Sequence, residues 1–203
     1  MEIQAVLKSP PLYMVLQRLV GGVQMRNTCI ELLSPKEGER ILDVGCGTAY
    51  YLRQMPEVDY HGFDIDHRYI SHARAHLGNR GKFYCQPFEE KQARQLGRFD
   101  AVMLIGILHH LDDDGCDRLL DLAASVLGPE GRVITIDTVF HAGQNWFERL
   151  LANNDRGKHV RRPEKFLALA ERAFESVDCS VENRRWIPSI VCYMILRHPR
   201  KSC

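Results

Sequence analysis

An apolar run, a single acid and two closely spaced glycines follow one another in residues 41–49, ILDVGCGTA. Apolar residues that lead directly into glycines are typical of a buried parallel strand whose end approaches a ligand closely, because glycine has no side chain to keep the two apart. Asp43 lies inside the apolar run, where a carboxylate is costly unless a donor or a cation compensates it. The stretch therefore predicts a parallel sheet with a binding site at the end of its first strand. An ordinary strand with a tight turn is the alternative.

Length and charge limit the class of protein. The chain of 203 residues is long enough for one α/β domain of ordinary size with a single hydrophobic core. The formal net charge is +1, so no overall attraction toward nucleic acid or an anionic membrane is expected. We therefore expect small-molecule chemistry and no nucleic-acid partner.

The seven cysteines are scattered, and none of them belongs to a CxxC pair. This pattern disfavours a zinc knuckle or a redox motif. The N-terminal sequence lacks the basic and apolar regions of a signal peptide, and no apolar run reaches the roughly 18 residues that span a bilayer. We expect a cytoplasmic protein without a membrane segment, and nothing in the sequence indicates its oligomeric state.

Short apolar runs alternate with helical patterns along most of the chain. Strands are expected at Arg40–Val44, Val58–Phe63, Lys82–Cys85, Phe99–Gly106, Arg132–Asp137, Ser176–Val181 and Ser189–Leu196. The first five alternate with helices and the last two follow one another directly. This order predicts an α/β fold with a doubly wound, mostly parallel, seven-stranded sheet, helices on both faces and one antiparallel strand. The clearest helix spans Cys116–Leu127, and Gly128-Pro129 is expected to end it.

Candidate binding residues fall where the expected strands end. In a doubly wound sheet the ligand lies outside the carboxyl ends of the strands, where the strand order reverses. Asp64 ends the second strand and lies roughly 20 residues beyond the glycine turn, the separation at which an acid accepts both hydroxyls of a ribose. The ligand is therefore expected to contain a nucleoside.

The glycine turn indicates what else the ligand carries. A dinucleotide-binding turn has a third Gly or Ala three residues after the second glycine, which lets the helix N-terminus meet a pyrophosphate. Tyr50 occupies that position here, and Asp43 would repel a pyrophosphate. A ligand with a positive charge suits Asp43 better. A NAD-dependent oxidoreductase would keep Asp64 but need the missing glycine, so it is the less favoured alternative.

Four motifs in order resemble those of class I S-adenosylmethionine-dependent methyltransferases, in the small-molecule branch (type 11/12-like). Residues 41–48 resemble the first signature, and residues 62–65 (GFDI) the second. Residues 99–112 resemble the fourth-strand motif and residues 131–134 the fifth strand. The resemblance extends from about Pro11 to Pro199. It implies a Rossmann-like fold, S-adenosylmethionine as cofactor with S-adenosylhomocysteine as product, and a small-molecule acceptor.

The resemblance implies that the ends of four strands bind the cofactor. The glycine turn would lie along the methionine part with Asp43 facing the ammonium group, and Asp64 would hold the ribose. Side chains after the second and third strands would flank the adenine, and main-chain carbonyls after the fourth would lie near the amino group. The implied cofactor-binding residues are Tyr13, Gln17, Asp43, Gly45, Cys46, Gly47, Asp64, Ile65, Phe88, Ile105 and Gly106.

One position departs from the family pattern. Members often carry an acid after the third strand that accepts a hydrogen bond from the adenine amino group, whereas Pro87 stands there in this chain. Gln86, Glu89 or water would have to replace it, while the backbone amide of Phe88 is available to a ring nitrogen.

The chain is expected to form a single domain over residues 1–203. Its parts are an N-terminal helical lid (1–36), a cofactor-binding core (37–138), an acceptor-side insertion (139–164), and a C-terminal helix with a β-hairpin (165–203). Two interpretations of the N-terminal helix remain open. It forms a lid over the glycine turn, with Tyr13, Gln17 or Arg26 reaching inward, or it packs on the edge of the sheet.

Two adjacent histidines follow the fourth strand. Methyl transfer from a sulfonium is an in-line displacement in which charge is lost, so the protein contributes mainly proximity, alignment and a dry site. A general base is needed only when the acceptor holds its proton at neutral pH. His110, followed by His109, is the leading candidate for a catalytic base, and His141 and His159 are rivals. Alternatively, the pair shapes the pocket and caps the next helix.

The insertion contains Asn153–Arg162, which resembles the Asp-Arg-Gly-x-x-Val-Arg stretch of some small bacterial methyltransferases. Its arginines Arg156, Arg161 and Arg162 either bind an acidic group of the acceptor or form a solvated basic face. His72 and His76 have a spacing that suits zinc, but no third ligand stands beside them, so no metal is expected.

The sequence therefore predicts an S-adenosylmethionine-dependent methyltransferase that acts at oxygen or nitrogen of a small molecule. A catalytically silent cofactor-binding protein would preserve every glycine and remains an alternative. A nucleic-acid methyltransferase would need a basic tract, and only residues 197–201 and the neighbourhood of Arg161 and Arg162 qualify.

Overall fold

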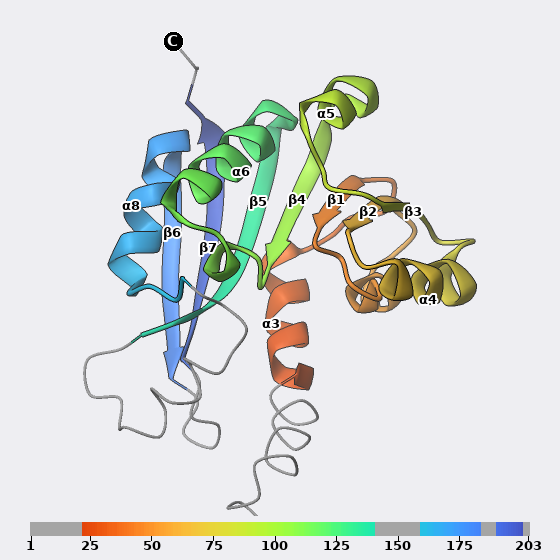
Figure 1. Ribbon diagram of the computed structural model, residues 1–203, viewed down its shortest axis with the longest axis horizontal. Helices are drawn as coiled ribbons and strands as arrows, with labels where there is room; N and C mark the ends of the chain where they lie inside the picture. Colours follow the sequence, from red (N-terminus) through yellow and green to blue (C-terminus); the bar gives the residue numbers. More distant parts are fainter. Residues whose placement is uncertain (1–21, 141–158, 184–189, 201–203) are drawn as a thin grey trace, which may run out of the picture.

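The computed structural model describes residues 22–140, 159–183 and 190–200. They form a seven-stranded sheet with the order β3-β2-β1-β4-β5-β7-β6 and helices on both faces (Figure 1). The predicted α/β doubly wound fold is confirmed.

Five strands make the parallel part of the sheet. They are β1 (Arg40–Val44), β2 (Asp59–Asp64), β3 (Gly81–Cys85), β4 (Phe99–Ile105) and β5 (Leu127–Val139). The chain runs from β1 outward to β3, then returns to the other side of β1 with β4. The strand order therefore reverses between β1 and β4, which is where a doubly wound sheet binds its ligand.

The last two strands complete the sheet. β6 (Phe174–Asn183) lies at the edge, and β7 (Ile190–Pro199) lies between β5 and β6 and runs antiparallel to both. The prediction of one antiparallel strand is therefore confirmed. Both strands are longer than the apolar pattern indicated, because the pairing of Phe174 with Pro199 extends the ladder.

Helices cover the two faces of the sheet. α3 (Gly22–Leu33), the 3-10 turn η2 (Tyr50–Gln54) and α4 (His67–Leu77) contribute to one apolar cluster, whose buried members include Cys29, Leu52 and Ile70. α6 (Asp113–Ser125) and α8 (Pro163–Ala173) contribute to the other cluster, and α5 (Glu90–Leu96) packs beside α6. Within β1, Ile41 faces the first cluster and Leu42 the second, as the two-residue period of a strand requires.

Two local predictions were wrong. β5 begins at Leu127, five residues before the expected Arg132, because the buried Leu127 pairs with Phe99 before the register shifts. A strand tolerates Pro129 beside such an irregularity. The alternation of strands and helices also predicted a helix between the first two strands, but after the glycine turn the chain forms the 3-10 turn η2, since Ala49 adopts a left-handed conformation (φ 54°) directly before it.

The predicted division into a lid, a core, an insertion and a C-terminal part stays a prediction. Tyr13, Gln17 and residues 141–158, including His141 and Arg156, lie outside the described residues. Among the helices that the structure describes, none is long and apolar enough to cross a bilayer.

Candidate cofactor and active site

The glycine turn after β1 is anchored to the neighbouring strand. The backbone N–H groups of Gly45 and Cys46 both donate to the carbonyl of Phe63 in β2, at 2.8 and 3.0 Å. Gly45 has φ 76°, and a Cβ added there would lie 3.3 Å from Cδ1 of Ile107. Glycine is therefore required at this position both by the backbone conformation and by the closeness of the loop that follows β4.

Asp64, at the end of β2, is held by two backbone amides. Gly47 donates to its Oδ2 at 2.9 Å, and Asp66 donates to its Oδ1 at 2.8 Å. An ionised carboxylate has about four acceptor positions, so each oxygen keeps the capacity to accept from a ligand. The half-buried side chain is thus oriented by the glycine turn itself, as a residue that binds the hydroxyls of a ribose requires.

Asp43 is 2% exposed and accepts a hydrogen bond from the hydroxyl of Tyr60 in β2 at 2.5 Å. The donor that a buried carboxylate needs is therefore found inside the protein. Burial raises the pKa of Asp43 to about 7, against the lowering effect of Tyr60 and with a further increase from the charge of Asp64. The predicted contact of Asp43 with the ammonium group of a cofactor stays a prediction.

The two residues predicted to flank an adenine differ in exposure. Ile65 directly follows β2 and is 78% exposed, which leaves its side chain free to contact a ligand. Phe88 is 7% exposed and packs edge-on against Phe63 with 5.0 Å between the ring centroids. The side chain of Phe88 is therefore committed to the core, and its backbone amide is the part left to meet a ligand.

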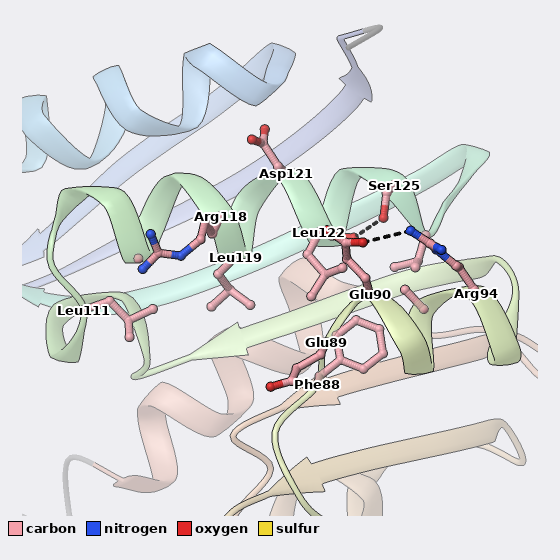
Figure 2. Close-up of a pocket in the computed structure, with 13 residues that line it drawn as sticks. Phe88, Glu89, Glu90, Arg94, Leu111, Arg118, Leu119, Asp121, Leu122 and Ser125 are labelled. Carbon is pink, nitrogen blue, oxygen red and sulfur yellow. Dashed lines mark hydrogen bonds and ion pairs between the residues drawn. The ribbon is translucent and has the colours of Figure 1, made fainter.

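A cavity of about 830 Å³ lies between α5 and α6, and Figure 2 shows Phe88 on one wall and Leu119 and Leu122 on the other. Of the predicted cofactor residues that the structure describes, only Phe88 lines it. The cavity therefore lies between two helices on one face of the sheet, whereas the predicted binding site lies at the ends of the strands.

The loop after β4 brings a third glycine to the same edge of the sheet. Gly106 has φ 67° and donates its N–H to the carbonyl of Ile136 in β5 at 2.7 Å. A Cβ added at Gly106 would lie 3.8 Å from Cε1 of His109. This contact places the ring of His109 directly beside the half-buried turn formed by Ile105 and Gly106.

His109 is paired with Asp137, a residue that the sequence interpretation did not select. Nδ1 of His109 lies 2.8 Å from Oδ1 of Asp137, and the backbone N–H of His109 donates to the same oxygen at 3.1 Å. His109 is 5% exposed and Asp137 2%. The only available signal was the place of Asp137 at the end of an expected strand, since 28 residues separate the two partners.

Two atoms of this pair are left without a partner. Within the described part of the chain, Oδ2 of Asp137 and Nε2 of His109 make no hydrogen bond. With Nδ1–H donated to Asp137, the lone pair of a neutral His109 is on Nε2. The arrangement is that of an oriented proton acceptor.

His110 is exposed, and its ring lies 4.2 Å from that of His109. The described residues provide no carboxylate partner for His110. His159, another predicted rival, is also exposed, and its N–H donates to the carbonyl of His109 at 3.0 Å. The two imidazoles predicted as catalytic are therefore adjacent, but only His109 is held in a fixed orientation.

Arg161 braces the loop that carries both histidines. Its guanidinium donates to the carboxylate of Asp113 at 2.9 Å and to the carbonyls of Leu108, Leu111 and His159. These contacts occupy the group that was considered for binding an acidic acceptor. The exposed Arg162 keeps that role as a prediction.

His72 and His76 stack on α4, and Nδ1 of His76 bonds to the carbonyl of His72. The described residues contain no group of three or more His, Cys, Asp or Glu side chains that is arranged to hold a metal ion.

Residues 41–131 match the family model described as "Methyltransferase domain". The N-methyltransferase NodS from Bradyrhizobium japonicum, solved with S-adenosyl-L-homocysteine, is similar in structure with a TM-score of 0.67. The alignment covers 87% of each chain at 16% sequence identity. Over these residues the predicted resemblance to class I S-adenosylmethionine-dependent methyltransferases is confirmed.

Curated relatives that match part of this chain differ in the substrate that their names give. A ubiquinone biosynthesis O-methyltransferase of Bordetella avium is 30% identical over 51% of this chain and 44% of its own. A tRNA U34 carboxymethyltransferase of Edwardsiella ictaluri is 34% identical over 38% of this chain and 26% of its own. The chain thus spans less than half the length of either relative.

The residues at these strand ends fit the cofactor of the matching family. Asp64 presents a carboxylate fixed by two amides, Ile65 presents an exposed apolar surface, and the glycine turn approaches without side chains. These three features lie at the ends of the adjacent strands β1 and β2, and β1 borders the reversal of strand order.

Proposed function

We propose that this chain is an S-adenosylmethionine-dependent methyltransferase that acts on a small-molecule acceptor. The observation that carries the proposal is the carboxylate of Asp64, fixed by the amides of Gly47 and Asp66 beside the exposed Ile65. A carboxylate held in this way accepts hydrogen bonds from paired hydroxyls without reorganising. The adjoining apolar surface suits a flat base.

The residues of this chain bind and orient the cofactor, which when bound supplies a methyl group on a positively charged sulfur. Asp64 accepts from the ribose, Ile65 contacts the adenine, and the Phe88 amide donates to a ring nitrogen. The glycine turn lies along the methionine part, and the carbonyls of Ile105 and Gly106 accept from its amino group. Asp43, Tyr13 and Gln17 are further proposed contacts at this end.

His109 accepts the proton of the acceptor in this proposal. Asp137 holds Nδ1–H, which leaves the lone pair on Nε2 and stabilises the imidazolium that forms after the proton is taken. This geometry favours His109 over His110, the leading candidate from sequence. Such a base serves a hydroxyl acceptor, which holds its proton at neutral pH and loses it as the methyl group is transferred. An amine that is protonated at neutral pH would use the same base and is the alternative acceptor. The O-methyltransferase among the relatives is consistent with a hydroxyl acceptor.

A binding titration of the full chain tests the cofactor class. We expect S-adenosylhomocysteine to bind and NAD not to bind, and Asp64→Ala to weaken binding at least about tenfold, since each hydrogen bond to a charged group contributes roughly 1.5 to 3 kcal/mol. Asp59→Asn is the matched control, because Asp59 lies at the opposite end of β2, where it pairs with Arg40 and Lys82. Binding of NAD instead, or equal losses in both variants, would contradict the proposal.

A methyl-transfer assay tests the acceptor class. The wild-type chain is incubated with cofactor labelled in its methyl group and with a catechol, a sugar alcohol, a primary amine or a transfer RNA. We expect label in a hydroxyl compound. Label only in the amine or the RNA would overturn the proposed acceptor while leaving the cofactor assignment intact.

A further inference from the structure

Two thiols face each other across the last two strands of the sheet. Sγ of Cys179 in β6 lies 3.5 Å from Sγ of Cys192 in β7. Cys179 pairs with Met194 and Cys192 with Val181, so the two cysteines are offset by two residues on the same face of the sheet. The sequence did not reveal the pair, because thirteen positions separate its members.

The two thiols have different environments. Cys179 is exposed on the edge strand, whereas Cys192 is 1% exposed within the apolar cluster beneath α6 and α8. A hydrogen bond from Cys192 lowers the pKa of Cys179 to about 7, against the opposing effects of burial and of Glu164 on α8. The same hydrogen bond and burial raise the pKa of Cys192. Cys179 is therefore the nucleophile of the pair, and Cys192 keeps its proton.

We propose that Cys179 and Cys192 form an oxidation site that reacts with hydroperoxides and closes to a disulfide between β6 and β7. The proposal rests on the 3.5 Å distance between an exposed and a buried sulfur on one face of adjacent strands. An S–S bond requires the sulfurs to approach to about 2.05 Å. The two sulfurs, 3.5 Å apart on the same face, therefore have to approach each other further for the bond to close.

The reaction balances in two steps. The Cys179 thiolate attacks one oxygen of hydrogen peroxide, the O–O bond breaks, and the leaving hydroxide takes a proton to become water, which leaves a sulfenic acid on Cys179. Sulfur of Cys192 then attacks the sulfenic sulfur, the S–O bond breaks, and the departing hydroxide takes the Cys192 proton as the second water. The two thiols are oxidised by two electrons and the peroxide is reduced to two waters.

The site lies next to the predicted acceptor side of the domain. Cys192 is the register partner of Asp137 in β5, and both residues share a face of the sheet. Asp137 in turn orients His109. The predicted cofactor residues that the structure describes lie on or after β1 to β4, so we expect oxidation to leave cofactor affinity unchanged.

The experiment treats the full 203-residue chain with one equivalent of hydrogen peroxide at pH 7.5, followed by peptide mapping without reduction. The expected product is a Cys179–Cys192 link, at least about tenfold more abundant than any other cysteine pair and reversed by dithiothreitol, because a thiolate next to a resolving thiol reacts selectively. Cys85 is the matched control, since it is also exposed but its sulfur contacts only the carbonyl of Ile65 among the described residues. We expect Cys85→Ser to form the link as the wild type does.

Two further variants show which cysteine reacts with the peroxide and which one closes the disulfide. We expect Cys179→Ser to form no link, and Cys192→Ser to accumulate a sulfenic acid on Cys179 that is trapped by dimedone. If Cys192→Ser does not fold, the peptide map of the oxidised wild-type chain still tests the proposal. A link from Cys179 to another cysteine, Cys203 included, overturns the proposal, as does oxidation of Cys85 before Cys179.

Discussion

One carboxylate oxygen of Asp137 accepts both the ring Nδ1–H and the backbone N–H of His109, at 2.8 and 3.1 Å. Two hydrogen bonds to one atom fix the ring and the main chain of His109 together. The pair joins the end of β5 to the loop after β4, so the position of His109 depends on two neighbouring strands.

Replacing Asp137 by Asn removes the negative charge but keeps the shape of the side chain. We expect turnover with a hydroxyl acceptor to fall about 10- to 100-fold, because the imidazolium that forms on His109 loses its stabilising partner. The dissociation constant of S-adenosylhomocysteine should stay within about twofold of wild type, as measured by calorimetry. His110→Ala is the control, and loss of turnover in that variant alone would make His110 the base.

The raised pKa of Asp43 predicts that stability declines as pH rises. Burial lifts the pKa from 3.8 to about 7, so the native state keeps this proton while the unfolded chain loses it. The free energy of unfolding should therefore fall between about pH 4 and 7 and level off above, by at most about 4 kcal/mol from this group. Urea unfolding at several pH values gives the free energy of unfolding of the wild type and of Asp43→Asn. Carboxylates such as Asp59, whose pKa is lowered, give a pH dependence of opposite sign, but they contribute equally to both proteins and cancel when the two free energies are subtracted. Parallel curves for the two proteins would show that Asp43 does not titrate in this range.

Substitutions at Gly45 and Gly38 distinguish the cost of backbone strain from an effect on ligand binding. Gly45 and Gly38 both have positive φ, 76° and 80°, but a Cβ at Gly38 meets nothing within 4 Å, whereas one at Gly45 meets Ile107. We expect Gly45→Ala and Gly38→Ala each to lose roughly 1 to 2 kcal/mol of stability. Only Gly45→Ala should also weaken S-adenosylhomocysteine binding. Equal binding by both variants would remove the turn from the cofactor site.

Substitution of Arg161 is expected to lower the stability of the protein strongly. Its guanidinium satisfies Asp113 and three carbonyls with the side chain 9% exposed, so Arg161→Met should cost about 2 to 4 kcal/mol in thermal unfolding. Arg172→Met is the control, because the Arg172–Asp117 pair is largely exposed and such pairs contribute about 0 to 1 kcal/mol. A similar small loss in both variants would show that the brace contributes little.

The arrangement of the strands was predictable because each buried strand is a short apolar run and the connections alternate in a regular way. The glycine turn and Asp64 were predictable for the same reason, since they stand where such runs end. The hydrogen-bond partners of the buried polar groups were not predictable. Tyr60 reaches Asp43 across 17 residues through the register of β1 and β2, and Asp137 in β5 reaches His109 in the loop after β4 across 28 residues.

The local sequence also gave a wrong strand boundary where pairing with a neighbouring strand outweighs the turn propensity of the residues. Gly128-Pro129 correctly indicated the end of a helix, yet the same residues belong to β5, because Leu127 pairs with Phe99 and the strand begins five residues before the expected Arg132. A propensity for a turn is a weak preference that a neighbouring strand overrides.

The hydrogen bond from Gly47 to Asp64 joins the turn after β1 to the acid at the end of β2 through protein groups alone. Two separate segments of chain are thereby held in their mutual placement by the fold itself. A ligand that bridges them spends little of its interaction energy on ordering the protein, because that conformational entropy was already lost during folding.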